Sequence, residues 1–166
     1  GQVEKFSLIN FVRKMKNDNF SRFVLYASLV TFSTNIAAPF FAVYMLRELH
    51  FSYLTFTLIS VTASISSLLA MVYWGKNIDK FGSIKILRIC GFLVGIVPIL
   101  WIFAKGDIFA IVLIQLLAGF SWAGYNLAVF NFINDSATQQ QRATFFAYFN
   151  ILAGIGIFLG ANLGGW

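Results

Sequence analysis

The chain has 166 residues, of which 59% are hydrophobic and 11% are charged, and its mean hydropathy is +0.79. A soluble domain of this size carries about 25% charged residues, so this composition excludes a water-soluble surface and predicts lipid as the main solvent. The net charge of +6 does not indicate a nucleic-acid partner, because the basic residues lie beside apolar runs, as they do where membrane orientation is encoded. With one cysteine, Cys90, the chain cannot form an intrachain disulfide.

Residues 1–21 form a basic segment that lacks the continuous apolar stretch and the small-residue cleavage site of a signal peptide. Four of its apolar residues fall on one helical face at i, i+3, i+4 and i+7, and they are Leu8, Phe11, Val12 and Met15. This pattern favours a linker that contains a short amphipathic helix on the membrane surface. A disordered basic tail is the alternative.

Five apolar runs follow, each long enough to cross the hydrocarbon core as a helix, which takes about 20 residues. They cover residues 22–45, 53–74, 84–104, 108–133 and 143–166. The runs are continuous rather than alternating, which argues against membrane strands. The sequence therefore predicts an all-α polytopic membrane protein with a transmembrane helical domain over residues 22–166. Ser52 and Asp107 are placed to cap the helices that follow them.

The basic residues are distributed unequally between the two ends of these helices. Ten of them lie on the side of the N-terminus, and only Arg47 and Lys105 lie on the other side. The positive-inside rule then places the N-terminus, with the linker at residues 1–21, and the loop that begins at Gly75 in the cytoplasm. We expect a multi-pass protein of the cell membrane, either a plasma membrane or the inner membrane of a bacterium or archaeon, with lipid as a partner.

A charged segment, GKNIDKFGSIKILR at residues 75–88, joins the second and third runs. Gly75 and Gly82 are expected to bracket a tight reversal, since glycine adopts positive φ at little steric cost. Asp79 is the only acid among several basic residues. Its carboxylate can pair with a basic residue of another helix or accept hydrogen bonds at a helix N-terminus, and either contact would tie helices together. If a rearrangement of the helices breaks that contact, the segment acts as a latch. Alternatively, these charges only set the topology.

This segment resembles the cytoplasmic signature of the major facilitator superfamily, Gly-x-x-x-Asp-Arg/Lys-x-Gly, which joins the second and third helices of each six-helix half. Ser83 and Ile84 stand where the family commonly has Arg or Lys. Residues 20–45 and 119–150 are also similar to such transporters, so the chain resembles helices seven to eleven of the twelve-helix fold. Five helices do not complete a six-helix half, and we expect the chain to be a fragment. The matched positions are Gly75, Asp79, Lys80 and Gly82, with Lys85 and Arg88 behind them.

The resemblance implies a secondary transporter that moves a small solute by alternating access between two halves. The missing half is then a partner, and the fragment alone is expected to be inactive. The implied cytoplasmic gating motif consists of Gly75, Asp79, Lys80, Gly82, Lys85, Arg88 and Arg142. By analogy, Asp79 contacts Arg142 or a helix N-terminus of the partner half. A non-transporting membrane scaffold or assembly subunit is the alternative function.

All six acids and the single histidine, His50, fall in loops or at the ends of the apolar runs. The runs therefore carry no proton-coupling group at mid-depth, which implies either a uniporter or a coupling residue in the other half. Gly119-Phe120-Ser121 offers a serine without a nearby base, and no metal cluster or carboxylate pair offers another route. We predict neither an enzyme nor a cofactor.

Neutral polar residues are the candidates for a substrate path. Gln115, Trp122 and Asn126 share one helical face, which suits a polar uncharged or aromatic solute, although the two amides can instead bond to neighbouring helices. Pro39 cannot donate to the carbonyl of Asn35, so that this helix either opens toward a cavity or bends for packing alone. The candidate path residues are Asn35, Gln115, Trp122, Asn126 and Asn150.

Three glycines of the fifth run, Gly156, Gly160 and Gly164, form a ladder of small residues at intervals of four. Such ladders let helix backbones approach closely, so a packing role is favoured. In the chain by itself, this ladder is expected to leave an unpaired face that promotes association with lipid or with another copy.

Overall fold

The computed structural model describes residues 19–165, and the regular elements within that range are all helical. Five helices are long and apolar enough to cross a membrane, which confirms the predicted all-α polytopic fold. Leu8 to Met15, the predicted amphipathic helix, lies outside the described residues. The elements are α2 (Asn19–Val43) with its π-helical continuation η1 (Tyr44–Glu48), α3 (Tyr53–Phe81), α4 (Ser83–Ala104), α5 (Ile108–Ser136) and α6 (Arg142–Gly164).

At the end of the molecule that carries the charged segment, α3 and α5 are longer than the apolar runs predicted from the sequence. α3 continues past Trp74 to Phe81, and α5 continues to Ser136. Gly75 therefore lies inside α3, and the expectation that it brackets the reversal together with Gly82 is wrong. The helix continues because its backbone hydrogen bonds do not require an apolar side chain at each position, and polar residues at a membrane surface can stay in water.

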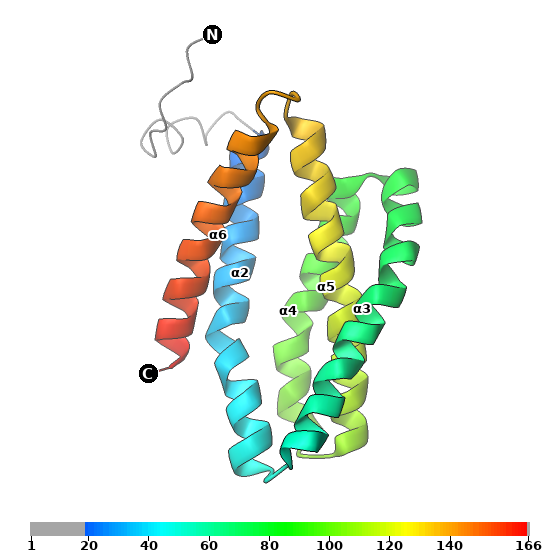
Figure 1. Cartoon of the computed structure of the whole chain (residues 1–166), viewed down its shortest axis with the longest axis vertical. Helices are drawn as coiled ribbons and strands as arrows, with labels where there is room; N and C mark the ends of the chain where they lie inside the picture. Colours follow the sequence, from blue (N-terminus) through cyan, green and yellow to red (C-terminus); the bar gives the residue numbers. More distant parts are fainter. Residues whose placement is uncertain (1–18, 166) are drawn as a thin grey trace.

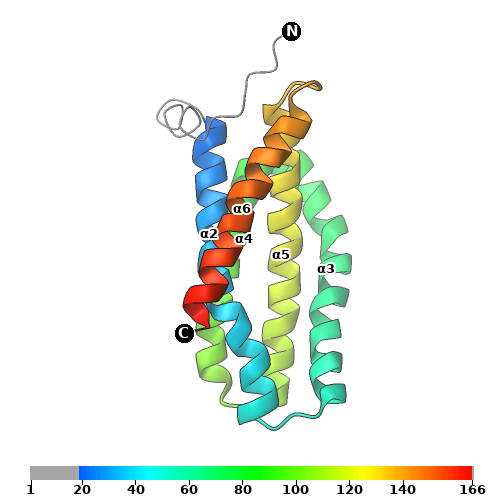
Figure 2. The same ribbon diagram turned by 60° about the vertical axis from the view of Figure 1, so that its left-hand side comes forward.

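The helices form two groups, which Figures 1 and 2 show from two sides. α2 packs along α6, whereas α5 packs along both α3 and α4. α2 and α3 meet at one end of the molecule through a short connection, and α5 and α6 are connected at the other end (Figure 1). The α2–α6 pair and the α3–α4–α5 group contact each other less extensively than the helices within each group do.

The α2–α6 pair is built on the glycine ladder. Gly156, Gly160 and Gly164 are buried, and each faces a backbone carbonyl of α2. A Cβ built on Gly156 would lie 2.9 Å from the carbonyl oxygen of Ser28, and those on Gly160 and Gly164 would meet Phe32 and Ile36 more closely still. The ladder is thus occupied by α2. The expectation that it offers an unpaired face is wrong, because helices far apart in sequence pair within the chain.

The α3–α5 contact uses small residues and polar side chains. Gly119 of α5 lies against the carbonyl of Ala63, so no larger residue fits there. The hydroxyl of Ser66 donates to the carbonyl of Leu116 at 2.6 Å, and the indole Nε1 of Trp74 donates to the carbonyl of Phe120 at 2.8 Å. These contacts fix the height of α3 relative to α5.

Two side-chain caps begin helices as the sequence predicts. The hydroxyl of Ser52 accepts from the backbone N–H of Thr55 at the start of α3. The carboxylate of Asp107 accepts from the N–H groups of Phe109 and Ala110 at the start of α5. Both caps satisfy backbone donors that have no partner inside their helix.

The buried side chains form two separate clusters, one at each end of the helices. At the end with the charged segment, Phe20 stacks near Phe145 with ring centroids 4.0 Å apart, and Phe23 lies 4.2 Å from Phe132. At the opposite end, Phe41 of α2 stacks on Trp101 of α4 at 4.7 Å. The two helix groups therefore touch mainly at their ends, and the middle of the molecule is left more open.

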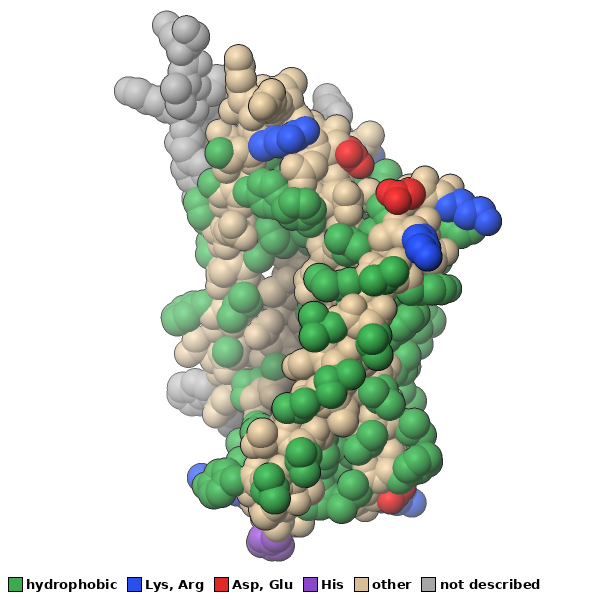
Figure 3. Space-filling view, turned by 45° about the vertical axis from the view of Figure 1, so that its right-hand side comes forward, with side chains coloured by type: hydrophobic (Ala, Val, Ile, Leu, Met, Phe, Trp, Pro, Cys, Tyr) green, Lys and Arg blue, Asp and Glu red, His purple; other side chains and the backbone are tan. Residues whose placement is uncertain are grey.

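On the face seen in Figure 3, hydrophobic side chains extend along most of the length of the molecule, and the charged side chains lie toward its two ends. Large hydrophobic side chains such as Leu54, Leu69, Phe92, Ile102 and Phe109 are exposed. An apolar surface of this extent would cause aggregation in water, whereas in a bilayer it contacts the lipid acyl chains. The chain is a multi-pass membrane protein whose outer surface contacts lipid.

Candidate functional site

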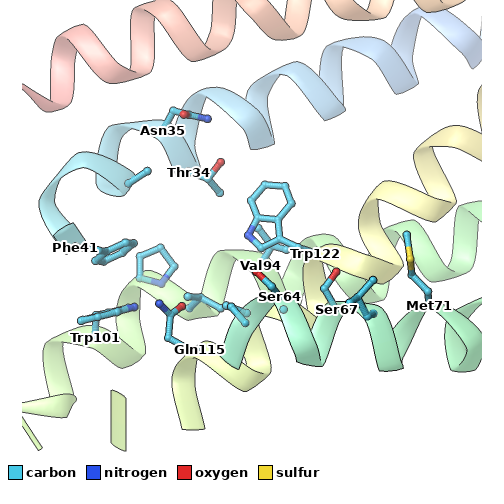
Figure 4. Close-up of a pocket in the computed structure, with 17 residues that line it drawn as sticks. Thr34, Asn35, Phe41, Ser64, Ser67, Met71, Val94, Trp101, Gln115 and Trp122 are labelled. Carbon is cyan, nitrogen blue, oxygen red and sulfur yellow. The ribbon is translucent and has the colours of Figure 1, made fainter. Parts of the chain in front are cut away.

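A cavity of about 670 Å³ lies between the two buried clusters and is walled by α2, α3, α4 and α5. Figure 4 shows how its side chains converge from these helices, and the face seen in Figure 3 is hollowed at about mid-height. A volume of this size is typical of a small-molecule site. Its lining includes Thr34, Asn35 and Phe41 of α2, Ser64, Ser67 and Met71 of α3, Val94, Pro98 and Trp101 of α4, and Gln115, Gly119 and Trp122 of α5.

Three of the five predicted path residues line this cavity. Gln115 and Trp122 project into it from α5, and Asn35 lies at its edge, where its amide donates to the carbonyl of Thr31 at 2.8 Å. Asn126 and Asn150 do not line the cavity, and both side chains are exposed. The helical spacing correctly groups Asn126 with Trp122, but the cavity does not extend one further turn along α5.

The ring of Trp122 is held in place by its own helix. It packs edge-on against Tyr125, with ring centroids 5.5 Å apart and planes at 83°. The buried hydroxyl of Tyr125 donates in turn to the backbone carbonyl of Ala27 at 3.3 Å, which ties α5 to α2. This contact fixes the indole at the cavity wall and links its position to the spacing between the two helix groups.

Two prolines leave backbone carbonyls without a helical donor in the cavity wall. Pro39 cannot donate to Asn35, and Pro98 cannot donate to Val94, because proline has no N–H. Both affected residues line the cavity. In a membrane helix, freed carbonyls are tolerated where they face a cavity or a neighbouring polar group.

Several residues that line the cavity were not predicted from the sequence. The serines of α3 and the aromatic pair Phe41 and Trp101 were not among the predicted path residues. Ser64, Ser67 and Met71 recur at i, i+3 and i+7, so they share one helical face, and this periodicity is a signal that the sequence carries. The Phe41–Trp101 contact joins two helices and has no comparable signal in the sequence.

The charged segment lies at one end of the molecule, around the α3–α4 connection. Lys80 and Lys85 each place their ammonium over the ring of Phe81, at 5.1 Å and 4.6 Å from its centroid. Asp79, Arg88 and Arg142 are exposed, and within residues 19–165 neither the carboxylate of Asp79 nor the guanidinium of Arg142 forms an ion pair or hydrogen bond. The backbone N–H of Arg142 donates to the carbonyl of Thr138 at 3.1 Å. The Asp79–Arg142 contact expected by analogy is not formed in this structure.

Ser83, at a position where the signature commonly has a basic residue, contacts the end of α5. Its hydroxyl donates to a carboxylate oxygen of Asp135 over a long 3.5 Å. The Ser83 side chain is buried, and Asp135 was not among the predicted motif residues. This contact connects the charged segment to α5, the helix that also carries Gln115 and Trp122.

These features define a class of protein, a helical membrane protein with a charged connection at one end and, midway along its helices, a mainly apolar cavity that contains several polar groups. A comparison with protein families identifies the particular family: the profile described as Major Facilitator Superfamily matches residues 23–166. The chain belongs to this superfamily, whose members are secondary membrane transporters rather than enzymes. Searches of curated proteins and of solved structures found no match.

Proposed function

We propose that the protein moves a small solute across the membrane by alternating access, with the cavity between the two helix groups as part of the path. The observation that carries this proposal is a cavity of about 670 Å³ at mid-depth, lined by Asn35, Gln115 and Trp122 together with hydroxyl groups. Polar groups at this depth are costly unless they serve packing or function. A membrane scaffold needs packing ladders and topology charges, but it has no need of such a cavity.

We further propose that a second half of the transporter completes the path and that the linker at residues 1–21 lies in the cytoplasm. The unequal distribution of basic residues supports this orientation. At the end that includes the charged segment, the described residues contribute Arg22, Lys76, Lys80, Lys85, Arg88 and Arg142, whereas Arg47 and Lys105 lie at the other end. The cell membrane is the proposed location, and the charged segment is the proposed cytoplasmic gate.

Cysteine accessibility in the full-length protein tests the transport path. Single cysteines replace Asn35, Gln115 or Trp122 in a Cys90→Ala background, and a membrane-impermeant thiol reagent is applied from each side in turn. Alternating access predicts labelling of the cavity positions from both sides, because each side gains access in one of the two states. Ile102→Cys is the control, because that side chain is 74% exposed on the lipid-facing surface and should stay unlabelled. Cavity cysteines that resist labelling from both sides would favour the scaffold.

A further inference from the structure

Polar side chains within the helices are mostly bonded to a backbone carbonyl. The hydroxyl groups of Ser60 and Ser121 donate to the carbonyl four residues earlier, at 2.9 Å and 2.7 Å, and the amide of Asn131 does the same at 2.9 Å. Such internal bonds are the ordinary way in which a polar side chain is accommodated in a membrane helix. In this protein, many polar side chains of the helices therefore have a hydrogen-bond partner within their own helix.

The cavity departs from this pattern. Among the described residues, no hydrogen-bond partner is found for the hydroxyls of Ser64 and Ser67, the amide of Gln115, or the indole N–H groups of Trp101 and Trp122. The same kind of indole N–H in Trp74, outside the cavity, donates to the carbonyl of Phe120. These groups come from three different helices and gather at the cavity. Outside it, the buried hydroxyl of Ser28 also has no hydrogen-bond partner among the described residues.

The cavity also presents flat aromatic surfaces. Phe41 and Trp101 stack with ring planes 19° apart, which forms one aromatic wall, and Trp122 approaches from α5 (Figure 4). Aromatic rings favour flat apolar partners in offset-stacked or edge-on arrangements. The remaining wall is largely aliphatic, with residues such as Leu68, Met71 and Val97.

Among the described residues, no charged side chain lines the cavity. A carboxylate or ammonium group on a ligand would lose its hydration against these helices without gaining a counter-charge from them, which is costly within a membrane. A sugar carries hydroxyl groups around its whole ring and would leave several of them against the aliphatic wall. The open indole N–H groups are donors only, so the ligand needs an acceptor oxygen.

We propose that the cavity binds an uncharged solute with a flat aromatic ring system and a carbonyl or similar acceptor group. The ring lies against Trp122 and the Phe41–Trp101 wall, while Ser64, Ser67 and Gln115 hydrogen-bond the polar end. This assignment rests on the proposed function, since it gives the substrate class for the proposed path. Its selectivity comes from desolvation, because a charged analogue of the same shape finds no partner for its charge on α2, α3, α4 or α5.

Three fluorescent probes that share one ring system test the proposal. They are coumarin-3-carboxamide, which is neutral, coumarin-3-carboxylate, and a coumarin that bears a trimethylammonium group. Binding to the full-length protein in detergent is measured by equilibrium dialysis. The neutral amide is expected to bind saturably and at least about tenfold more tightly than either charged probe. Equal or tighter binding of a charged probe, or displacement of the amide by glucose, would overturn the assignment.

Matched variants show whether the probe occupies this cavity. Ser64→Ala and Trp122→Phe should each weaken binding of the amide by about three- to tenfold, because one hydrogen bond or one indole N–H is lost. Ser60→Ala, on the same helix one turn earlier and bonded to Phe56, should leave binding unchanged. The same loss with Ser60→Ala as with Ser64→Ala would contradict the site, and thermal unfolding of each variant confirms that it is folded.

The binding experiment tests the ligand class, and the cysteine experiment tests alternating access, so that either proposal can fail without the other. Cavity cysteines that are labelled from both sides, in a protein that does not bind the carboxamide, would overturn the ligand class and leave transport standing. Binding of the carboxamide with the expected losses, in a protein whose cavity is never reached from a second side, would support the site and contradict alternating access.

Discussion

At the scale of single residues, the backbone of Gly82 decides where the charged segment reverses direction. Its φ of 83° and ψ of 154° lie in a region that residues with a Cβ rarely adopt. No atom lies within 4 Å of a Cβ built on it, so the constraint is conformational rather than steric. Gly75, the other glycine of the signature, is inside α3 and has no such requirement.

Alanine substitutions distinguish Gly82, which needs a positive φ, from Gly75, which lies inside a helix. Gly82→Ala should lower the free energy of unfolding by about 1–3 kcal/mol, since the backbone of alanine is strained at positive φ. Gly75→Ala should be neutral or stabilise the protein by up to about 1 kcal/mol, because alanine favours helix and the new Cβ would lie 4.0 Å from Leu127. SDS titration of the detergent-solubilised protein, followed by circular dichroism, measures both. An equal loss at Gly75 would contradict this placement of the turn.

At the scale of helices, the glycine ladder sets the distance between α2 and α6. Gly160→Ala forces its Cβ against the carbonyl of Phe32 and should destabilise the protein by about 1–3 kcal/mol, the usual cost of overpacking. Gly154→Ala lies on the same helix, and no atom is found within 4 Å of its built Cβ, so it should be neutral or slightly stabilising. Thermal unfolding in detergent compares the two, and equal melting temperatures would argue against close α2–α6 packing.

The start of α5 depends on one carboxylate. Asp107→Ala removes the acceptor for the N–H groups of Phe109 and Ala110 and should cost about 0.5–2 kcal/mol. Asp107→Asn keeps a capping oxygen and should retain most of this free energy. Comparing the two variants by SDS titration separates the cap from the charge. If the asparagine variant loses as much as the alanine variant, the charge matters rather than the cap.

At the scale of the whole molecule, the protein consists of two helix groups that touch at their ends around a central cavity. Tyr125 links the groups through the carbonyl of Ala27, and Phe41 and Trp101 link them at the far end. A change in the spacing of the groups must therefore alter the cavity wall. The exposed charges at the end of α3 lie at the end of the molecule where α5 and α6 are connected.

The proposed latch gives a whole-molecule prediction. Asp79→Asn in the full-length protein should raise the cytoplasmic labelling rate of a cysteine at position 122 severalfold, because a latch between Asp79 and the proposed second half would lose its charge-assisted contact. Membrane insertion should be unchanged. Lys105→Gln, a charge change at the opposite end, is the control and should leave that rate unaltered. An unchanged rate in Asp79→Asn would leave these charges with a role in topology only.

The class of fold and the two path residues of α5, Gln115 and Trp122, could be predicted from the amino-acid sequence alone. Five long apolar runs cannot satisfy their backbone groups in lipid except as helices, and this constraint acts locally along the chain. The caps at Ser52 and Asp107 were likewise predictable, since a cap involves residues only two or three positions apart. Gln115 and Trp122 were found through their spacing on one helix.

The pairing of the helices and the position of the cavity could not be predicted from the sequence, because they depend on packing between distant segments. The tertiary structure joined the glycine ladder to α2, brought Phe41 next to Trp101, and left Asn126 and Asn150 outside the cavity. These outcomes depend on how each helix is rotated about its axis and which neighbour it meets. Periodicity identifies a face of a helix, whereas the partner of that face is set by packing between segments that are distant in the chain.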